Sequence, residues 1–101
     1  MDSIIQADFG RCYLCGRRGT GADPLDRHHV FFGALRKQSE KYGLVVYLHH
    51  TSCHIFGAGA VHANGEVCRA LQADVQKRAM EHYGWSAAEF RRRFRKSYIS
   101  K

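Results

Sequence analysis

Metal-ligating side chains are concentrated in the first half of this 101-residue chain. Two thiols stand close together at Cys12 and Cys15, and five of the seven histidines lie between residues 26 and 54. In the same stretch a further thiol, Cys53, stands directly before His54. Thiolates and imidazoles are the ligands that zinc prefers, and imidazole also titrates near neutral pH. The pattern therefore indicates metal binding, acid–base chemistry or both.

One structural zinc site is predicted from two pairs of ligands. Cys12 and Cys15 form the first pair, and Cys53 with either His49 or His50 forms the second. Neighbours in an extended segment face opposite sides, so only one of these histidines can bind the ion. We favour His49, because it directly follows the apolar run of a predicted strand. A redox pair or ordinary buried thiols are the alternative, but the sequence lacks the thioredoxin-like α/β pattern that a redox pair normally has.

A second group of histidines falls outside this zinc site. His28 and His29 stand at the start of a predicted strand, and His54 follows Cys53. Adjacent residues on a helix diverge by about 100°. Cys53 can therefore hold zinc while His54 faces a second site. Asp26 is a candidate for orienting one of the histidine rings through a hydrogen bond, although a carboxylate that only ends a loop is the simpler interpretation.

The elements that position these residues predict an α+β domain. β-Branched and aromatic residues predict strands over 29–32 and 44–48, and the helix formers between them predict a helical turn or loop over 33–43. Thr51 and Ser52 are suited to cap the start of a helix through their hydroxyls. A knuckle followed by a strand that leads into a helix is the geometry of a treble-clef zinc finger.

Two further helices are predicted near the C-terminus. Asn64 is suited to cap the first helix and Gly84 to end it. The apolar residues of this helix repeat every four positions, at Val67, Leu71, Val75 and Ala79. Ser86 and Glu89 form a capping box for the second helix, with Trp85 and Phe90 placed as a hydrophobic staple. Cys68 lies close to the apolar stripe and is predicted to be a small core residue.

Composition and charge limit the class of protein. The length fits a single domain over residues 1–101, and the net charge of +7 favours a nucleic-acid partner over a neutral one. The alternative is a solvated cationic surface that only keeps the protein soluble. The sequence has no apolar run near the length of a membrane span and no export signal, so we expect a soluble, cytoplasmic protein without membrane contact.

The order of these motifs resembles a known family. Over residues 12–62, the cysteine knuckle, the histidine pair on a strand, the second strand and the Cys-His pair at a helix start resemble the HNH, or ββα-metal, nucleases. The helices of residues 64–96 resemble the tail of small phage and prophage HNH-like proteins. The resemblance implies a small ββα-metal treble-clef domain with a zinc knuckle, a short β-hairpin and C-terminal basic helices.

The resemblance also implies an activity, the hydrolysis of phosphodiester bonds in DNA. It makes His29 the general base and makes His28 and His54 ligands of one catalytic ion, Mg²⁺ or another divalent ion, with His62 a candidate to complete the set. The structural ion is Zn²⁺. Such hydrolysis needs a base of near-neutral pKa and a cation on the phosphate, which one imidazole and one ion can supply. One site cuts one strand at a time, so a homodimer is a possible arrangement if the protein makes double-strand breaks.

Contacts to DNA phosphates are expected from two groups of basic residues. Near the histidines these are Arg27, Arg36 and Lys37. In the last helix and just after it they are Arg91, Arg92, Arg93, Arg95 and Lys96. Such contacts hold the backbone without reading the base sequence.

The chain departs from the family pattern at one position. The family has an asparagine that fixes the loop orienting the base, whereas no asparagine occurs from His29 to His54, so Gln38 or Ser39 would have to substitute. One alternative is therefore a catalytically inactive, zinc-dependent DNA- or protein-binding module of phage origin, in which the second group of histidines is structural. Another is a small inhibitor or recombination accessory protein that acts through a partner.

Overall fold

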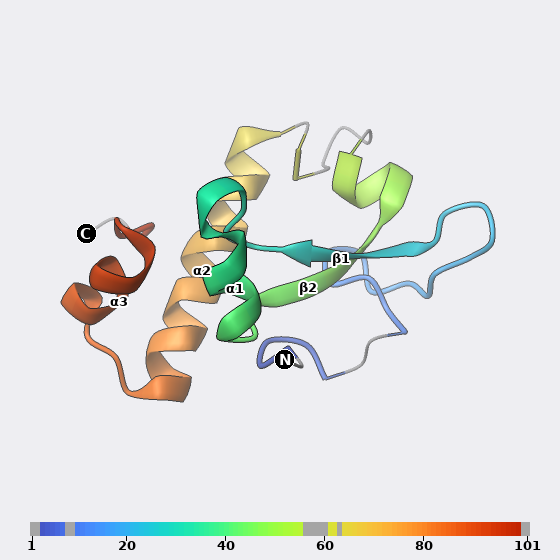
Figure 1. Ribbon diagram of the computed structural model, residues 1–101. Coiled ribbons are helices and arrows are strands. Elements are labelled where there is room, and N and C mark those ends of the chain that lie inside the picture. The colour runs from blue at the N-terminus through green and yellow to red at the C-terminus, as the bar shows by residue number, and fades with distance from the viewer. Residues whose placement is uncertain (1–2, 8–9, 56–60, 63, 100–101) are drawn as a thin grey trace.

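The computed structural model describes residues 3–7, 10–55, 61, 62 and 64–99 (Figure 1). In chain order its elements are β1 (Leu25–His29), the 3-10 turn η1 (Gly33–Leu35), α1 (Arg36–Lys41), β2 (Val45–His49), the π-helical turn η2 (His50–Ile55), α2 (Gly65–Tyr83) and α3 (Ala87–Phe94). The two strands pair antiparallel, and the connection between them contains α1. This arrangement confirms the predicted α+β class.

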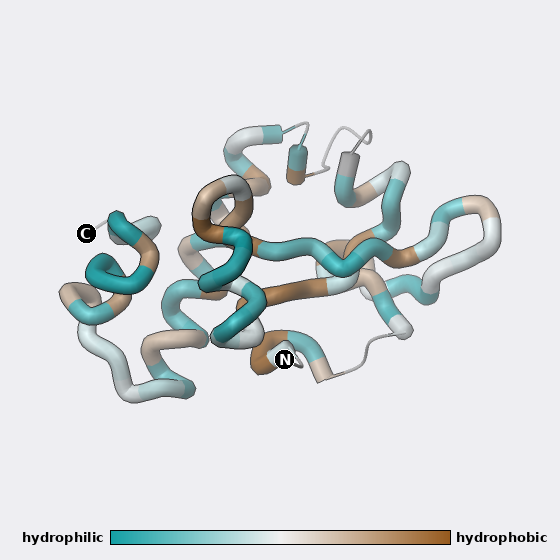
Figure 2. Tube along the Cα trace, viewed as in Figure 1, coloured by the Kyte–Doolittle hydropathy of each residue, from teal (hydrophilic) through white to brown (hydrophobic). Residues whose placement is uncertain are grey.

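The two strands differ in character, as Figure 2 shows. β2 is apolar, and Val45, Val46 and Leu48 are fully buried. β1 is polar along most of its length, and its register places His28 opposite Val46 and His29 opposite Val45. β2 therefore anchors the sheet in the core, while β1 carries the side chains that can do chemistry.

The predicted strand over 29–32 is wrong. β1 ends at His29, and the chain then bends so that Val30 and Phe31 turn into the core. One ladder-like bond persists from Val30 N to Leu44 O at 3.1 Å, but the next amide, that of Phe31, donates to the Ser39 hydroxyl at 3.3 Å. The apolar run is thus buried by a turn rather than by strand pairing. β2 lies within one residue of its prediction, and the predicted helical turn over 33–43 is confirmed by η1 and α1.

The C-terminal helices form where their capping residues predict. The Asn64 side chain accepts hydrogen bonds from Glu66 N at 3.0 Å and Val67 N at 3.2 Å, and Gly84 ends α2 with φ of 71°. The Ser86 hydroxyl accepts from Glu89 N at 3.1 Å at the start of α3. Each of these bonds satisfies an otherwise unpaired backbone group at a helix end.

An aromatic cluster joins α3 to the segment after β1. The Phe31 ring lies 5.5 Å from that of Phe90, 5.0 Å from Phe94 and 4.8 Å from Tyr98, measured between ring centroids. The buried Gln76 side chain on α2 holds the chain after α3, because its oxygen accepts from Tyr98 N at 2.6 Å. α3 consequently lies at the end of the molecule opposite η2 (Figure 1). Among the described helices, none has the length and apolar character needed to cross a membrane.

Candidate metal centres

The cysteine knuckle is a tight turn that is hydrogen-bonded to β2. Cys12 N donates to Arg17 O at 2.8 Å, and Gly16 N donates back to Cys12 O at 2.9 Å. Gly16 has φ of 76°, a left-handed conformation that favours glycine. Tyr13 N donates to Tyr47 O at 2.8 Å, which fixes the knuckle beside β2. The two thiols are thereby brought to the end of the strand that carries His49.

Four side chains converge at this place with the spacing of a tetrahedral metal site. One donor atom each from Cys12, Cys15, His49 and Cys53 lies within 4.8 Å of all the others. His49 Nδ1 is 3.3 Å from Cys15 Sγ and 3.9 Å from Cys53 Sγ. Zinc bonds of about 2.3 Å to sulfur and about 2.0 Å to nitrogen separate such atoms by about 3.5 Å in a tetrahedron. The cluster can therefore hold a metal ion such as zinc.

His49, rather than His50, belongs to this cluster. His49 Nε2 lies 2.8 Å from Arg18 O, and because a carbonyl only accepts, Nε2 must carry the proton and Nδ1 is left as the ligand atom. His50 lies on the other side of the chain, where its Nδ1 is 2.5 Å from Asp26 Oδ2. The strand alternation that separates neighbouring residues thus extends to the end of β2.

The buried thiols of this cluster have perturbed proton affinities. Burial raises the pKa of Cys53 to about 11. For Cys12 burial also acts upward, but hydrogen bonds from the backbone of Cys15 and His49 outweigh it and lower the pKa. Because zinc binds thiolates, the ion must displace the remaining thiol protons, so binding is expected to release protons.

η2 is held by an acid from a distant loop. The Asp23 carboxylate accepts hydrogen bonds from Thr51 N at 2.7 Å, from Ser52 N at 3.3 Å and from the Ser52 hydroxyl at 2.6 Å. The prediction that the hydroxyls of Thr51 and Ser52 cap a helix is therefore wrong, since Asp23 supplies the capping oxygen. The turn that it fixes directs Cys53 toward the knuckle and His54 toward β1.

A second cluster consists of histidines only. One nitrogen each of His28, His54 and His62 lies within 4.8 Å of the others, and His28 Nδ1 is 3.2 Å from His54 Nε2. His62 is placed by the backbone, because its N donates to His54 O at 3.0 Å while Val61 N donates to Cys53 O at 3.0 Å. The three histidines predicted as ligands of a second ion are thus brought together.

The burial and hydrogen bonds of the rings in this cluster suit the binding of a cation. The His28 side chain is 3% exposed, and burial, followed by the nearby His54 and His62, lowers its pKa to about 3. Its Nε2 is buried without a hydrogen-bond partner in the described part of the chain. Asp26 Oδ2 lies 2.9 Å from His54 Nδ1, which places the proton there and leaves Nε2 as the ligand atom. A buried His28 ring with a lowered pKa, beside a His54 ring whose Nε2 is free to bind, suits a divalent ion.

The Asp26 carboxylate lies within hydrogen-bonding distance of two histidine rings, those of His50 and His54. Burial acts to raise the pKa of Asp26, but the hydrogen bonds from His54 and then His50 outweigh it, and the pKa is lowered. Asp26 therefore stays ionised near neutral pH. A fixed anion behind a ligating histidine raises the basicity of that ligand and holds its ring orientation.

The histidine cluster opens into a cavity that also reaches His29. This cavity of about 420 Å³ is lined by His28, His29, His54, His62, Arg27, Arg36, Phe32 and Gly33. A neighbouring cavity of about 750 Å³ shares His29, Arg27 and Arg36 and adds Lys37, Glu40 and Lys41. The predicted base, the predicted ion ligands and the first group of predicted phosphate contacts therefore surround one region.

Glu40 is a site residue that the sequence did not indicate. Its Oε1 lies 2.7 Å from His29 Nε2, and its Oε2 lies 2.6 Å from Arg27 Nη2. The residues expected to substitute for asparagine have other partners: Gln38 donates to Arg93 O at 3.3 Å, and Ser39 donates to Leu44 O at 2.6 Å. The spacing of Glu40 from His29 along the chain matches no familiar motif, so only the fold reveals the pair.

The second group of basic residues lies away from the histidines. Four of its members are exposed, namely Arg91, Arg92, Arg95 and Lys96. Arg93 differs, because its guanidinium lies 4.8 Å from the Trp85 ring centroid and pairs with Glu89 at 2.6 Å. Arg92 also pairs with Glu89, at 2.5 Å. Arg93 therefore stabilises the packing of α3.

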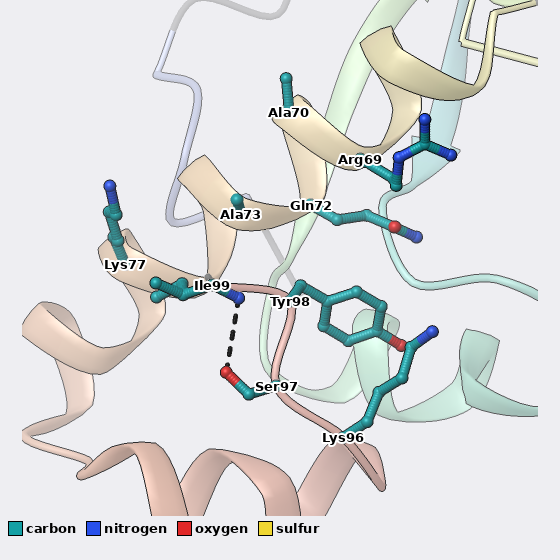
Figure 3. Close-up of a pocket in the computed structure, with 9 residues that line it drawn as sticks. All are labelled: Arg69, Ala70, Gln72, Ala73, Lys77, Lys96, Ser97, Tyr98 and Ile99. Carbon is teal, nitrogen blue, oxygen red and sulfur yellow. Dashed lines mark hydrogen bonds between the residues drawn. The ribbon is translucent and has the colours of Figure 1, made fainter. Parts of the chain in front are cut away.

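Lys96 also lines a basic cavity between α2 and the chain that follows α3 (Figure 3). This cavity has a volume of about 540 Å³, and its other cationic lining residues are Arg69 and Lys77. Gln72 lies in the same wall and donates to Val30 O at 3.3 Å. Gln72 thus connects this wall of the cavity with the segment that follows β1.

Comparisons of the chain with protein-family models, with curated proteins and with solved structures gave no match. The functional interpretation therefore depends on the two clusters and their surroundings.

Proposed function

We propose that this chain is a metal-dependent DNA endonuclease of the HNH, or ββα-metal, type. The observation that carries the proposal is a cluster of three histidine nitrogens within 4.8 Å, in a cavity that His29 and two arginines also line. A purely structural metal site would not need the further imidazole of His29 beside it. In this proposal His28, His54 and His62 hold the ion, and His29 is the general base.

The Cys12–Cys15 knuckle, the paired strands and the turn carrying Cys53 support a treble-clef interpretation of the fold. In that interpretation the cysteine cluster holds a structural Zn²⁺, and the neighbouring His54 faces the reaction. A zinc ion held there would fix the turn η2, which carries both Cys53 and His54. In this proposal the turn η2 contributes one ligand to the structural zinc and one to the catalytic ion.

His29 supplies the proton transfer. A water molecule in the cavity loses a proton to Nδ1 of His29 as its oxygen forms a bond to phosphorus. The bond from phosphorus to the deoxyribose oxygen then breaks, and that oxygen takes a proton from solvent. His29 returns its own proton to solvent and completes the cycle. General-base catalysis of this kind contributes about 10²–10⁴-fold to a rate.

His28, His54 and His62 would hold a divalent ion, and such an ion would stabilise negative charge on the scissile phosphate and on the leaving oxygen. Imidazole donors suit first-row transition ions better than Mg²⁺, which prefers oxygen ligands. The donor set of this chain therefore favours an ion such as Ni²⁺ or Zn²⁺ at the catalytic position, with Mg²⁺ a weaker occupant.

DNA is the substrate proposed from charge. Arg36 and Lys37 are exposed beside the histidines, and the net charge of the chain is +7. Such residues bind phosphates and position a duplex without selecting its sequence. Arg27 is held by Glu40 and by the Tyr47 hydroxyl, at 2.6 Å and 2.9 Å, so it contributes positive potential from a fixed position.

Plasmid nicking tests the proposal. The wild-type protein is assayed with Mg²⁺, Mn²⁺, Ni²⁺ or Zn²⁺, beside His29→Ala and a control, His82→Ala, which removes an exposed histidine from the end of α2. We expect His29→Ala to lose at least about 100-fold in cleavage while it still binds DNA, and His82→Ala to match the wild type. Equal nicking by wild type and His29→Ala would remove His29 from the mechanism.

A catalytically inactive DNA-binding module is the second candidate, favoured by the lack of an asparagine between His29 and His54. Metal counting separates the two functions. Two ions per chain, one of them removed by mild chelation without unfolding, support the enzyme. A single zinc whose removal unfolds the chain supports the module.

A further inference from the structure

The base proposed for the reaction has one ring nitrogen held by a carboxylate. His29 Nε2 lies 2.7 Å from Glu40 Oε1, and the His29 side chain is only 13% exposed. An ionised carboxylate accepts hydrogen bonds but cannot donate them. The hydrogen bond from Arg27, followed by that from His29, holds the pKa of Glu40 well below its ordinary value, so the group is ionised. Nε2 of a neutral His29 must then carry the proton, and Nδ1 keeps the lone pair.

Glu40 is itself held in place. Arg27 donates to both of its oxygens, through Nε at 3.2 Å and through Nη2 at 2.6 Å, and uses Nη1 to bond the Tyr47 hydroxyl at 2.9 Å. Arg27 and His29 are two residues apart on β1, so they share the face that meets α1. A two-pronged contact with an arginine fixes a carboxylate in direction as well as position.

α1 is anchored next to Glu40. The buried Ser39 hydroxyl donates to Leu44 O at 2.6 Å and accepts from Phe31 N at 3.3 Å. Gly43 then ends the helical segment with φ of 70°. The loop between the strands is thus fixed by Ser39, while the next residue, Glu40, reaches back to β1.

We propose that Glu40 is the positioning residue of this site: it holds His29 in the Nε2–H tautomer and directs Nδ1 into the cavity beside the histidine cluster. The proposal rests on the proposed function for its catalytic consequence, and on the contacts of Glu40 for its structural part. In this proposal Glu40 takes the orienting role that the resemblance assigns to an asparagine, which the connection between β1 and β2 lacks.

The test combines a structural and a kinetic measurement on Glu40→Ala, Glu40→Gln and Tyr47→Phe. The Tyr47→Phe control removes a partner of Arg27 but leaves the Glu40–His29 pair intact. Long-range ¹H–¹⁵N spectra of histidine-labelled protein report which ring nitrogen of His29 carries the proton, and they are recorded about two pH units above the ordinary histidine pKa of about 6.5. Thermal melts check that each variant is folded.

We expect wild type and Tyr47→Phe to show His29 in the Nε2–H form, and Glu40→Ala to show a mixture of tautomers. Glu40→Gln retains the Nε2–H form, because its amide oxygen still accepts that bond. In cleavage, Glu40→Ala loses about 10- to 100-fold in kcat, while KM stays within about threefold, since only the base is misdirected. Glu40→Gln loses less than Glu40→Ala.

The outcomes distinguish this inference from the nuclease proposal. If wild type cleaves and Glu40→Ala changes neither the tautomer nor kcat, the nuclease stands and the role of Glu40 is overturned. A rise in KM at constant kcat also overturns it, because Glu40 would then act through Arg27 on DNA binding. If wild type does not cleave but Glu40→Ala still mixes the tautomers, Glu40 positions His29 and the nuclease proposal fails.

Discussion

Replacing Cys12 by serine tests the zinc cluster most directly. Cys12 is 2% exposed and is the only residue of the described stretch 10–24 that belongs to the buried apolar core. A serine hydroxyl stays protonated at neutral pH and is a poor zinc ligand, whereas the thiolate is a strong one. The substitution therefore removes a ligand with almost no change in volume.

The expected loss is large compared with the stability of such a domain. Structural zinc contributes about 10–16 kcal/mol in small modules, whereas a whole domain is stable by about 5–15 kcal/mol. The knuckle has little apolar burial to replace that contribution. We expect Cys12→Ser to lose at least about 5 kcal/mol, which corresponds to about 20–40 °C in Tm at this chain length. Much of the variant should be unfolded at room temperature.

The assay measures zinc per chain by native mass spectrometry and Tm by circular dichroism. Cys68→Ser is the matched control, because Cys68 is half-buried on α2 and belongs to neither cluster. It should keep its zinc and lose only about 1–2 kcal/mol, as is common for a modest core change. If Cys12→Ser keeps one zinc per chain and melts within about 5 °C of the wild type, the cluster is not a structural zinc site.

Three further predictions concern the ligand support in the second cluster, the aromatic core and the protonation of the buried His28. Asp26→Ala should weaken binding of the second ion by about 10–100-fold in calorimetry, because His54 loses the anion behind its ring. Phe94→Ala should lower the free energy of unfolding by about 3–5 kcal/mol in denaturant titrations, since the ring is fully buried. Without the second ion, the free energy of unfolding should fall by about 1.4 kcal/mol per pH unit between about pH 6.5 and pH 3, because His28 binds a proton at a higher pH in the unfolded chain than in the folded one. His28→Leu should flatten this dependence, whereas His82→Ala should leave it unchanged. Unchanged ion binding in Asp26→Ala, an unchanged free energy of unfolding in Phe94→Ala, or a pH dependence in His28→Leu equal to that of the wild type would contradict the corresponding contact.

Local features of the chain were predictable because they depend on neighbours in the sequence. The caps at Asn64, Gly84 and Ser86 form as predicted, since each bonds backbone groups within a few residues. The antiparallel strands and the helical connection between them were also predictable from residue type. The strand over 29–32 was not, because the same apolar run satisfies a strand or a buried turn, and the bond from Phe31 N to Ser39 decides between them.

The acidic residues that support the site are brought to it by long-range contacts, and no sequence motif marks them. Asp23 reaches Thr51 and Ser52 across more than 25 residues, and Glu40 reaches back to His29. Acidic residues in loops and helices usually face solvent, so neither position stands out in the sequence. Asp26 stands close to the histidine pair in the sequence and was therefore a candidate for orienting a ring, but its partners His50 and His54 lie more than 20 residues away, so only the fold identifies them.

The turn η2 explains why the two clusters occur together in so small a chain. Cys53 and His54 are adjacent, yet one joins the cysteine cluster and the other joins His28. The backbone oxygens of both residues also accept bonds from Val61 and His62, so the third histidine depends on the same turn. An ion held by the cysteines would therefore help to fix His54 and His62, two of the residues in the second cluster. Stability and the proposed chemistry are therefore linked through one turn, so a substitution that releases η2 should disturb both clusters together.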